Sequence, residues 1–449
     1  MLYLIIAIVC LVLSGYLFKI ATGTISLRSP NMMSLIFYFY FALENVVGAV
    51  LIVNNIDDHY IINKLSNDIY RYYGFWAIMY TIVLFPIGML MANMLFKAGG
   101  MNDYYEDYVT SPITDEPEEI SNHVRNCLIV LSVISVLAVL YTLASIGGSP
   151  LSALLSGMDP TDLNLMRSEA NRGFSGNEYF RNVFGILLTP FLSYVAYGYK
   201  IYDNSIFNKC WFYVMLVSSI LILTYDLEKA PLLWYLLGFM FYRVYLGYRL
   251  SNMVLISVFA VFSGLIIGMY VVLSSFDLDT LFVFNQGIIG RLTLSSNAGV
   301  FVSFELFPQN HDFLGLSSFS NLISDFLSVP YNERSARLVM EFVNPSGVEQ
   351  GIAGVFNSLF VSEAWANWGI IGLLLSPIYV GFLIQCLYLF LLFSRKTPVF
   401  MGLLVFYTIR CSINGGINDY IYNISTLIMV IVIVGIYSTC KNANSVSNI

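Results

Sequence analysis

Arginines and carboxylates gather in two polar stretches of a chain that is otherwise strongly apolar. Residues 147–182 include MRSEANRGFSGNEYFRN at 166–182, which holds three arginines. Residues 274–366 include VPYNERSARLVMEFVNPSGVEQGIAG at 329–354, and SLFVSEAWANWGIIG follows at 358–372. A guanidinium keeps its charge and offers a planar set of donors that matches the oxygens of a phosphate. The two stretches therefore predict a binding site for a phosphate-bearing anion.

Seven cations are candidates for binding that anion. Most lie in or beside the two polar stretches, where contact with lipid phosphates is the alternative interpretation. Lys229 lies in the tight turn YDLEKAP, and Arg410 lies in a short apolar run just before Asn414. A charged residue in a membrane span costs on the order of 3 kcal/mol, so it is a functional candidate unless it extends to the surface. The candidate set is Arg167, Arg172, Arg291, Arg334, Arg337, Lys229 and Arg410.

Three residues of the second stretch are candidates for a base that takes a proton from a hydroxyl group: Glu363, Glu341 and His311. His311 is the only histidine in the two polar stretches, and a histidine can accept a proton near neutral pH. A solvated loop histidine is the alternative interpretation. Glu363 has the best placement of the three, because it lies at the start of an apolar run beside two tryptophans.

The composition places these residues in a membrane protein. The 449-residue chain is 58% hydrophobic and 11% charged, and its mean hydropathy is +0.74. Soluble domains are roughly a quarter charged. We therefore predict an all-α polytopic protein with a single integral membrane domain over residues 1–449. About eleven runs have spanning length: 2–20, 32–53, 74–96, 126–146, 183–199, 211–225, 230–246, 252–273, 367–393, 399–413 and 420–438.

The distribution of Lys and Arg predicts how these spans are oriented. Short cytoplasmic loops accumulate positive charge. With the N-terminus outside, most cations of the short connections fall inside, and the outer ones hold only Lys64, Arg71 and Lys229. This orientation puts both polar stretches on the non-cytoplasmic side, where they can face a shared cavity, and it puts the C-terminus in the cytoplasm.

Other features exclude several classes of protein. The cations are scattered rather than gathered into a basic stripe, so we expect no nucleic acid partner. The six cysteines lie in or beside predicted spans, which leaves no disulfide framework and no cysteine pair for a metal. The acidic segment 97–125 is interpreted as a solvated linker. Residues 285–301 have an amphipathic pattern, and we expect a helix there that lies along the membrane interface.

The second polar stretch resembles the bacterial oligosaccharide repeat-unit polymerases, the Wzy-type O-antigen polymerases. A Pro-containing segment with arginines (329–337) and a glycine-punctuated stretch (347–354) precede Glu-Ala-Trp-Ala-Asn-Trp-Gly-Ile-Ile-Gly at 363–372. This last run is similar to the family signature E-A-Y-x-N-F-G-x-x-G. The Asp-Phe-Leu-Gly element at 312–315 and the basic turn at Lys229 also look like family features.

The resemblance covers about two thirds of the chain and implies a GT-C-like, metal-independent and cofactor-free glycosyltransferase. It implies that arginines hold undecaprenyl pyrophosphate while a carboxylate or histidine deprotonates the acceptor hydroxyl. The expected location is the bacterial inner membrane, and the expected partners are the lipid-linked oligosaccharide, the bilayer, a chain-length regulator and a flippase. Three alternatives remain open: an O-antigen ligase, a lipid-linked oligosaccharide flippase, and a polysaccharide-binding scaffold. The long outer stretch and the lack of a sequence repeat count against a flippase.

Overall fold

The described part of the chain is mostly helical and has only two short strands, which confirms the predicted all-α class. The computed structural model describes residues 1–146, 156, 166, 170, 173–274, 283–285, 287–349 and 354–446. Within them the chain forms two compact units, each assembled from separate pieces of sequence. Unit 1 comprises Met1–Tyr105, Phe276–Phe390 and Cys411–Tyr422, and unit 2 comprises Glu106–Ser275, Leu391–Arg410 and Asn423–Ile449. Hydropathy predicted one membrane domain and could not reveal this division.

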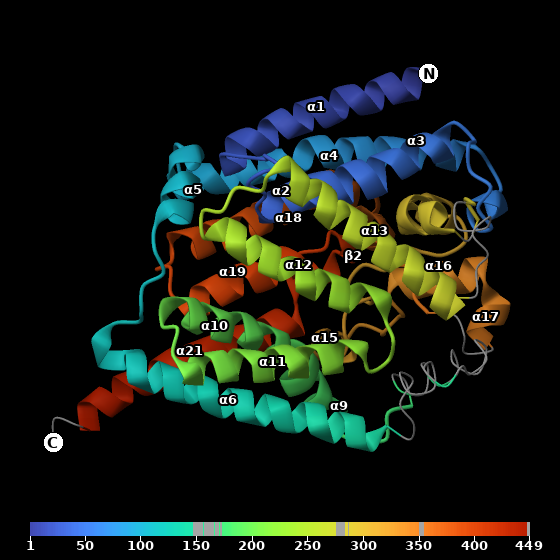
Figure 1. Cartoon of the computed structure of the whole chain (residues 1–449). Helices are drawn as coiled ribbons and strands as arrows, with labels where there is room; N and C mark the ends of the chain where they lie inside the picture. The colour runs from blue at the N-terminus through green and yellow to red at the C-terminus, as the bar shows by residue number, and fades with distance from the viewer. Residues whose placement is uncertain are drawn as a thin grey trace. The chain divides into compact units, whose positions relative to one another are not determined.

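Unit 1 begins with long apolar helices that pack side by side. They are α1 (Leu2–Thr22), the continuous run α2 (Met32–Leu35), η1 (Ile36–Val46) and α3 (Val47–Val53), and α4 (Ile69–Leu95). The short helix η2 (Ile62–Lys64) precedes α4, and the polar helix α5 (Met101–Thr110) follows it and crosses the boundary of the unit. Figure 1 shows α1 lying along α4, and Ser14 of α1 donates to the Ile82 carbonyl of α4 at 2.8 Å. The side chain of Asn31 accepts from the Ser34 amide and so caps α2.

Close approach of backbones joins α4 to α18 (Val361–Phe393). A Cβ on Gly88 would collide with the Ile378 carbonyl, and a Cβ on Gly381 would collide with the Phe85 carbonyl. Small residues at facing positions allow membrane helices to pack this tightly. Nearby, the buried amide of Gln385 donates to Asn93 Oδ1 at 2.7 Å and to the Ala21 carbonyl at 2.9 Å. These bonds tie α1, α4 and α18 together.

The rest of unit 1 consists of short elements that build the candidate site. They are η5 (Gly290–Ser295), α14 (Ser296–Leu306), α15 (Asn321–Leu327), α16 (Ser335–Val343), α17 (Pro345–Glu349), β1 (Ser358–Leu359), β2 (Asn414–Gly415) and α20 (Asn418–Ile421). The expectation of an interfacial helix over 285–301 is wrong for its second half. Every residue from Asn297 to Leu306 is buried, because α14 packs against α4, α16 and β1.

Unit 2 is a helical bundle. Its elements are α6 (Glu118–Ser145), α9 (Glu178–Phe180), η3 (Arg181–Leu188), α10 (Thr189–Tyr202), α11 (Ile206–Thr224), α12 (Lys229–Tyr245), α13 (Asn252–Ser274), α19 (Pro398–Arg410) and α21 (Ile424–Val446). Helix α10 packs against α11 and α19, and the hydroxyl of Tyr194 donates to the Tyr235 carbonyl at 2.6 Å. Trp211 of α11 donates to Ser132 of α6 at 2.9 Å.

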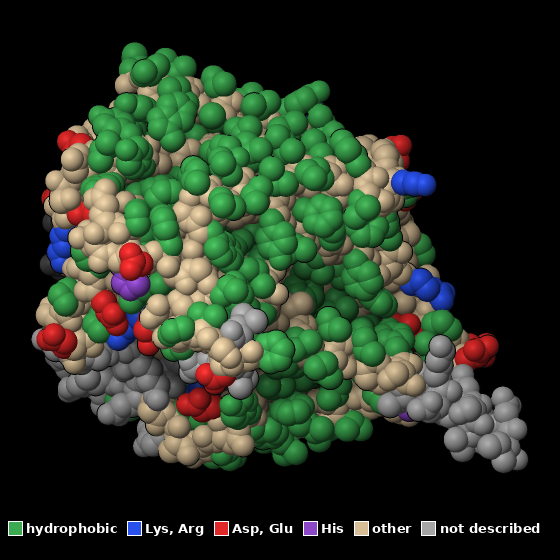
Figure 2. All heavy atoms as spheres, turned by 180° about the vertical axis from the view of Figure 1, so that it is seen from behind, with side chains coloured by type: hydrophobic (Ala, Val, Ile, Leu, Met, Phe, Trp, Pro, Cys, Tyr) green, Lys and Arg blue, Asp and Glu red, His purple; other side chains and the backbone are tan. Residues whose placement is uncertain are grey.

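Many of these helices expose apolar side chains, as a membrane protein requires. Seven helices among the described residues are long and apolar enough to cross a membrane: Leu2–Thr22, Met32–Val53, Ile69–Leu95, Glu118–Ser145, Ile206–Thr224, Val361–Phe393 and Asn418–Ser438. Figure 2 shows broad areas of exposed hydrophobic side chains. On α1 alone, Val9 and Val12 are 60% and 68% exposed. The chain is therefore a multi-pass membrane protein. Helices cover all eleven predicted runs, but the count of eleven spans stays a prediction.

Candidate functional site

Three segments of unit 1 that lie far apart in the sequence meet at one place. They are the connection 54–68, the part of the second polar stretch from 285 to 363, and the connection 414–419. Ser358 pairs with Gly415 and Leu359 pairs with Asn414, so that β1 and β2 form a short antiparallel ladder. The charge pattern assigns all three segments to the non-cytoplasmic side of the membrane, and that orientation stays a prediction.

Arg334, Glu363 and Asp419 form an ion cluster at this meeting point. Arg334 Nε lies 2.8 Å from Glu363 Oε1, Nη2 lies 2.9 Å from Oε2, and Nη1 lies 2.9 Å from Asp419 Oδ1. Glu363 is 2% exposed and also accepts from the Asn418 amide at 3.0 Å. Burial lowers the pKa of Arg334, but the bonds from Glu363 and Asp419 outweigh it and raise that pKa. The guanidinium of Arg334 therefore binds two carboxylates at once.

The cluster leaves no room for a side chain at Gly416. A Cβ there would collide with both Glu363 Oε2 and Arg334 Nη2. Glycine at this position therefore lets the backbone of the 414–419 connection pass directly beside the ion pair.

Two sequence elements noted earlier fit together around a break in α18. Gly369 has a φ of +57°, which interrupts the helix after Trp368. The carbonyls of Ala366 and Asn367, just before the break, accept from the amides of Leu314 and Gly315, each at 2.9 Å. The Asp-Phe-Leu-Gly element at 312–315 therefore binds the backbone that the break in α18 exposes, and this contact helps to hold Glu363 in place.

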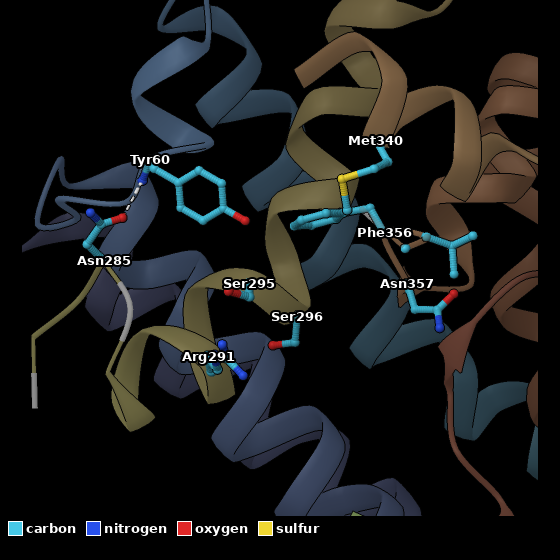
Figure 3. Close-up of a pocket in the computed structure, with 10 residues that line it drawn as sticks. Tyr60, Asn285, Arg291, Ser295, Ser296, Met340, Phe356 and Asn357 are labelled. Atoms are coloured by element: carbon cyan, nitrogen blue, oxygen red, sulfur yellow. Dashed lines mark hydrogen bonds between the residues drawn. The ribbon is translucent and has the colours of Figure 1, made fainter. Parts of the chain in front are cut away.

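A cavity of about 760 Å³ opens in unit 1. Its lining combines one guanidinium, two serine hydroxyls, two amides, a phenol and a phenyl ring: Tyr60, Asn285, Arg291, Ser295, Ser296, Met340, Gly354, Val355, Phe356 and Asn357. Figure 3 shows the Tyr60 ring facing Met340 and Phe356 across the space, with Arg291, Ser295 and Ser296 below. Tyr60 is held by its amide, which donates to Asn285 Oδ1 at 3.0 Å.

One polar side of the cavity comes from η5, which is wound as a π-helix, and from Ser296, the first residue of α14. The wider turn and the spacing of four and five residues put Arg291, Ser295 and Ser296 on one face. Burial raises the pKa of Tyr60, and the charge of Arg291 acts in the opposite direction. Arg291 is therefore close enough to place positive charge in the cavity.

Arg337 and Glu341 adjoin this cavity and bind each other. Arg337 Nε lies 3.0 Å from Glu341 Oε1, and its Nη1 donates to the Gly354 carbonyl at 3.4 Å. Both residues are partly exposed, and Glu341 follows Met340, which lines the cavity. His311 is placed differently: its Nδ1 lies 2.8 Å from the Asp312 carbonyl, and its ring packs against Phe307.

A comparison with known protein families, curated proteins and solved structures finds no match to this chain. The resemblance to the repeat-unit polymerases therefore stays a hypothesis based on the residues themselves.

The remaining candidates are not part of this site as described. Arg167 and Arg172 lie outside the described residues. Lys229 and Arg410 belong to unit 2. Lys229 is the first residue of α12, and its side chain lies outside the described part. Arg410 is exposed; it lies over the ring of Phe406 at 4.8 Å and donates to the Ile186 carbonyl at 3.3 Å.

Sequence reasoning missed several polar residues of the site. Asp419 stands in a short polar connection between two apolar runs, and His59 stands in the polar run NNIDDHY. Both lie outside the two longest polar stretches. Glu44 had the clearest signal, since it is an ionisable residue inside a predicted span. Its carboxylate accepts from the amide of Asn414, which also contacts Asn45 at 3.2 Å.

Proposed function

We propose that this protein polymerises oligosaccharide repeat units carried on undecaprenyl pyrophosphate, at the outer face of the bacterial inner membrane. The composition of the cavity supports this proposal most strongly. A guanidinium suits a phosphate, and hydroxyls, amides and aromatic rings suit the hydroxyl groups and apolar faces of a sugar. The cavity belongs to a unit rich in apolar helices, as a substrate with a polyprenyl tail requires.

In this reaction the hydroxyl of an incoming lipid-linked repeat attacks the anomeric carbon of the growing glycan. The new glycosidic bond forms as the bond from that carbon to the pyrophosphate breaks, and the pyrophosphate leaves with the electron pair. A base takes the hydroxyl proton. Fixed cations that bind the departing pyrophosphate lower the barrier without a metal or cofactor.

The contacts in unit 1 suggest how the candidates divide these tasks. Arg291 lines the cavity and is our first choice for binding pyrophosphate, with Arg337 as its neighbour. Glu341 is our first choice for the base, because it is partly exposed beside the cavity. Glu363 would have to give up its bonds to Arg334 before it could take a proton, so we assign that pair to holding the site together.

The test is to delete the gene and resolve the surface polysaccharide of the cell by size on a gel. A polymerase predicts that the ladder collapses to core plus one repeat unit and that a plasmid copy restores it. Loss of every repeat from the core, with long polymer remaining on undecaprenyl pyrophosphate, would instead identify a ligase. Loss of both would indicate a flippase, and an unchanged ladder would contradict all three.

A further inference from the structure

A buried histidine contacts a hydroxyl group of the cavity lining. His59 is fully buried, and its Nε2 lies 3.0 Å from Ser295 Oγ. Its connection is held in place by a buried ion pair, in which Arg71 Nη1 lies 2.6 Å from Asp57 Oδ2. Arg71 also donates to the Ile52 carbonyl at 2.8 Å, at the end of α3. The imidazole therefore has a fixed position behind Ser295.

The neighbouring hydroxyls of η5 and α14 direct their protons to the helix backbone. Thr293 donates to the Ile289 carbonyl at 2.7 Å, and Ser296 donates to the Leu292 carbonyl at 2.7 Å. This is the usual arrangement for Ser and Thr within a helix. Ser295 differs, because its hydroxyl forms a hydrogen bond with the ring of His59.

The other ring nitrogen decides the tautomer of His59. Nδ1 is buried and has no hydrogen-bond partner among the described residues. A buried N–H without an acceptor is rarer and more unfavourable than a buried lone pair without a donor. The proton of the neutral ring therefore belongs on Nε2, where it is donated to Ser295 Oγ. Burial lowers the pKa of His59 to about 4, which keeps the ring neutral at physiological pH.

This arrangement sets the polarity of Ser295. Because the oxygen of Ser295 accepts from His59, its O–H remains available to donate to another group. Ser295 lines the cavity, so that group is a ligand in the cavity. The residue lies one turn from Arg291 on the same face of η5. A hydroxyl donor and a guanidinium together fit an oxyanion with several acceptor oxygens.

We propose that His59 is a positioning residue that fixes Ser295 Oγ as a hydrogen-bond donor to a phosphate group bound beside Arg291. The identity of the ligand as a lipid pyrophosphate rests on the proposed function, whereas the hydrogen-bond polarity of the pair does not.

The first experiment measures the tautomer directly. The chain has three histidines, His59, His123 and His311, so imidazole ¹⁵N spectra of the full-length protein in nanodiscs contain few signals. The variant His59→Gln identifies the signal of His59 by its loss. We expect Nε2 to carry the proton at pH 7. A proton on Nδ1, or a doubly protonated ring at pH 7, would overturn the proposal.

The second experiment measures binding of undecaprenyl pyrophosphate in nanodiscs to matched variants. Ser295→Ala and His59→Leu should each weaken binding on the order of tenfold, the effect of one hydrogen bond to a charged group. The double variant should be no weaker than either single variant, because both remove the same bond. Ser295→Thr and His59→Gln should restore binding, since they keep a hydroxyl and a donor at the position of Nε2. The proposal would be contradicted if the losses of binding in the two single variants added up in the double variant. It would also be contradicted if Ser295→Thr and His59→Gln lost as much binding as Ser295→Ala and His59→Leu.

Inorganic phosphate as a competitor distinguishes the source of the ligand. If phosphate displaces the lipid and its binding is weakened by Ser295→Ala to the same extent, the subsite recognises phosphate itself. If only the lipid shows that dependence, the subsite is specific for the lipid-linked form. The purified variants must keep the melting temperature of the wild type; if His59→Leu does not fold, Ser295→Ala and the spectra still decide. An intact polysaccharide ladder after gene deletion would refute the polymerase and leave the tautomer result standing.

Discussion

Arg334 binds Glu363 through two parallel hydrogen bonds, from Nε to Oε1 at 2.8 Å and from Nη2 to Oε2 at 2.9 Å. The carboxylate is almost fully buried, whereas Asp419, the third member of the cluster, has a side chain that is 44% exposed. The two ion pairs are therefore unequal in energy, although they share one guanidinium.

We expect Arg334→Ala to lower the free energy of unfolding by about 3 kcal/mol, because it leaves Glu363 buried without its counter-charge. Asp419→Asn should cost about 1 kcal/mol or less, since that pair is open to solvent. Glu363→Gln should fall between them. Unfolding of the detergent-solubilised protein followed by tryptophan fluorescence measures all three. A loss at Asp419 as large as the loss at Arg334 would refute the ranking.

Gly369→Ala should be strongly unfavourable. The φ of +57° is a left-handed conformation, and a Cβ would lie 2.8 Å from the ring of Phe313. The left-handed conformation alone costs an alanine roughly 1–2 kcal/mol. Gly264→Ala in α13 is the matched control, because a Cβ there meets nothing within 4 Å, and it should be neutral or stabilising. Comparison of the two melting temperatures tests the break in α18; equal effects would contradict it.

Arg291→Ala should reduce polymerisation roughly tenfold to a hundredfold, the effect of losing a charged hydrogen-bond donor to pyrophosphate. Arg291→Lys should recover part of the activity, since it keeps the charge but not the planar fork. Arg249→Ala is the control, because Arg249 lies in an exposed pair with Glu106 in unit 2.

The length of polymer in cells complemented with each variant provides the readout for these arginines. The phosphate-binding part of the proposal fails if chain length stays unchanged after charge removal at every one of the five arginines of the polar stretches, Arg167, Arg172, Arg291, Arg334 and Arg337.

The depressed pKa of His59 predicts how stability depends on pH. The unfolded chain binds this proton near the ordinary histidine pKa of 6.5, whereas the folded protein binds it only near 4. The unfolded state therefore holds more proton between these values, and stability falls as the pH falls from about 6.5 towards 4. His59→Gln should flatten this part of the profile. Asp57 and Asp58 lie on the same connection, and Arg71, which binds Asp57, lies in α4. All three are unchanged in both proteins, so the difference between the two profiles isolates the imidazole.

A metal-independent reaction predicts that EDTA leaves polymerisation unchanged. One acidic pair, Asp277 and Asp279, has the spacing of a metal-binding D-x-D motif and lies outside the described residues. Loss of activity in EDTA with recovery on adding Mg²⁺ or Mn²⁺ would assign a metal to that pair. The variant Asp277→Asn would then show the same loss.

The sequence predicted the helices well because hydropathy is a local property of each run. It also identified the 363–372 run and the 312–315 element. Their hydrogen bonds to each other could not be predicted, because they depend on the backbone break at Gly369. The partners of Arg334 could not be predicted, since Glu363 at the start of α18 is 29 residues away in the sequence and Asp419 is 85 residues away. The burial of α14 was missed because an amphipathic pattern fits a membrane surface and a protein interior equally well.

The division of unit 1 has a consequence for how the protein is made. Its first helices leave the ribosome long before residues 276–390, and the strip Cys411–Tyr422 emerges after both. Glu44, Glu363 and Arg334 all bind residues of that strip. Until the strip emerges, these charged groups lack some of their hydrogen-bond partners in a partly assembled membrane bundle. The site is therefore completed only after this strip has emerged, and nascent chains that stop before residue 411 should be targets for membrane quality control.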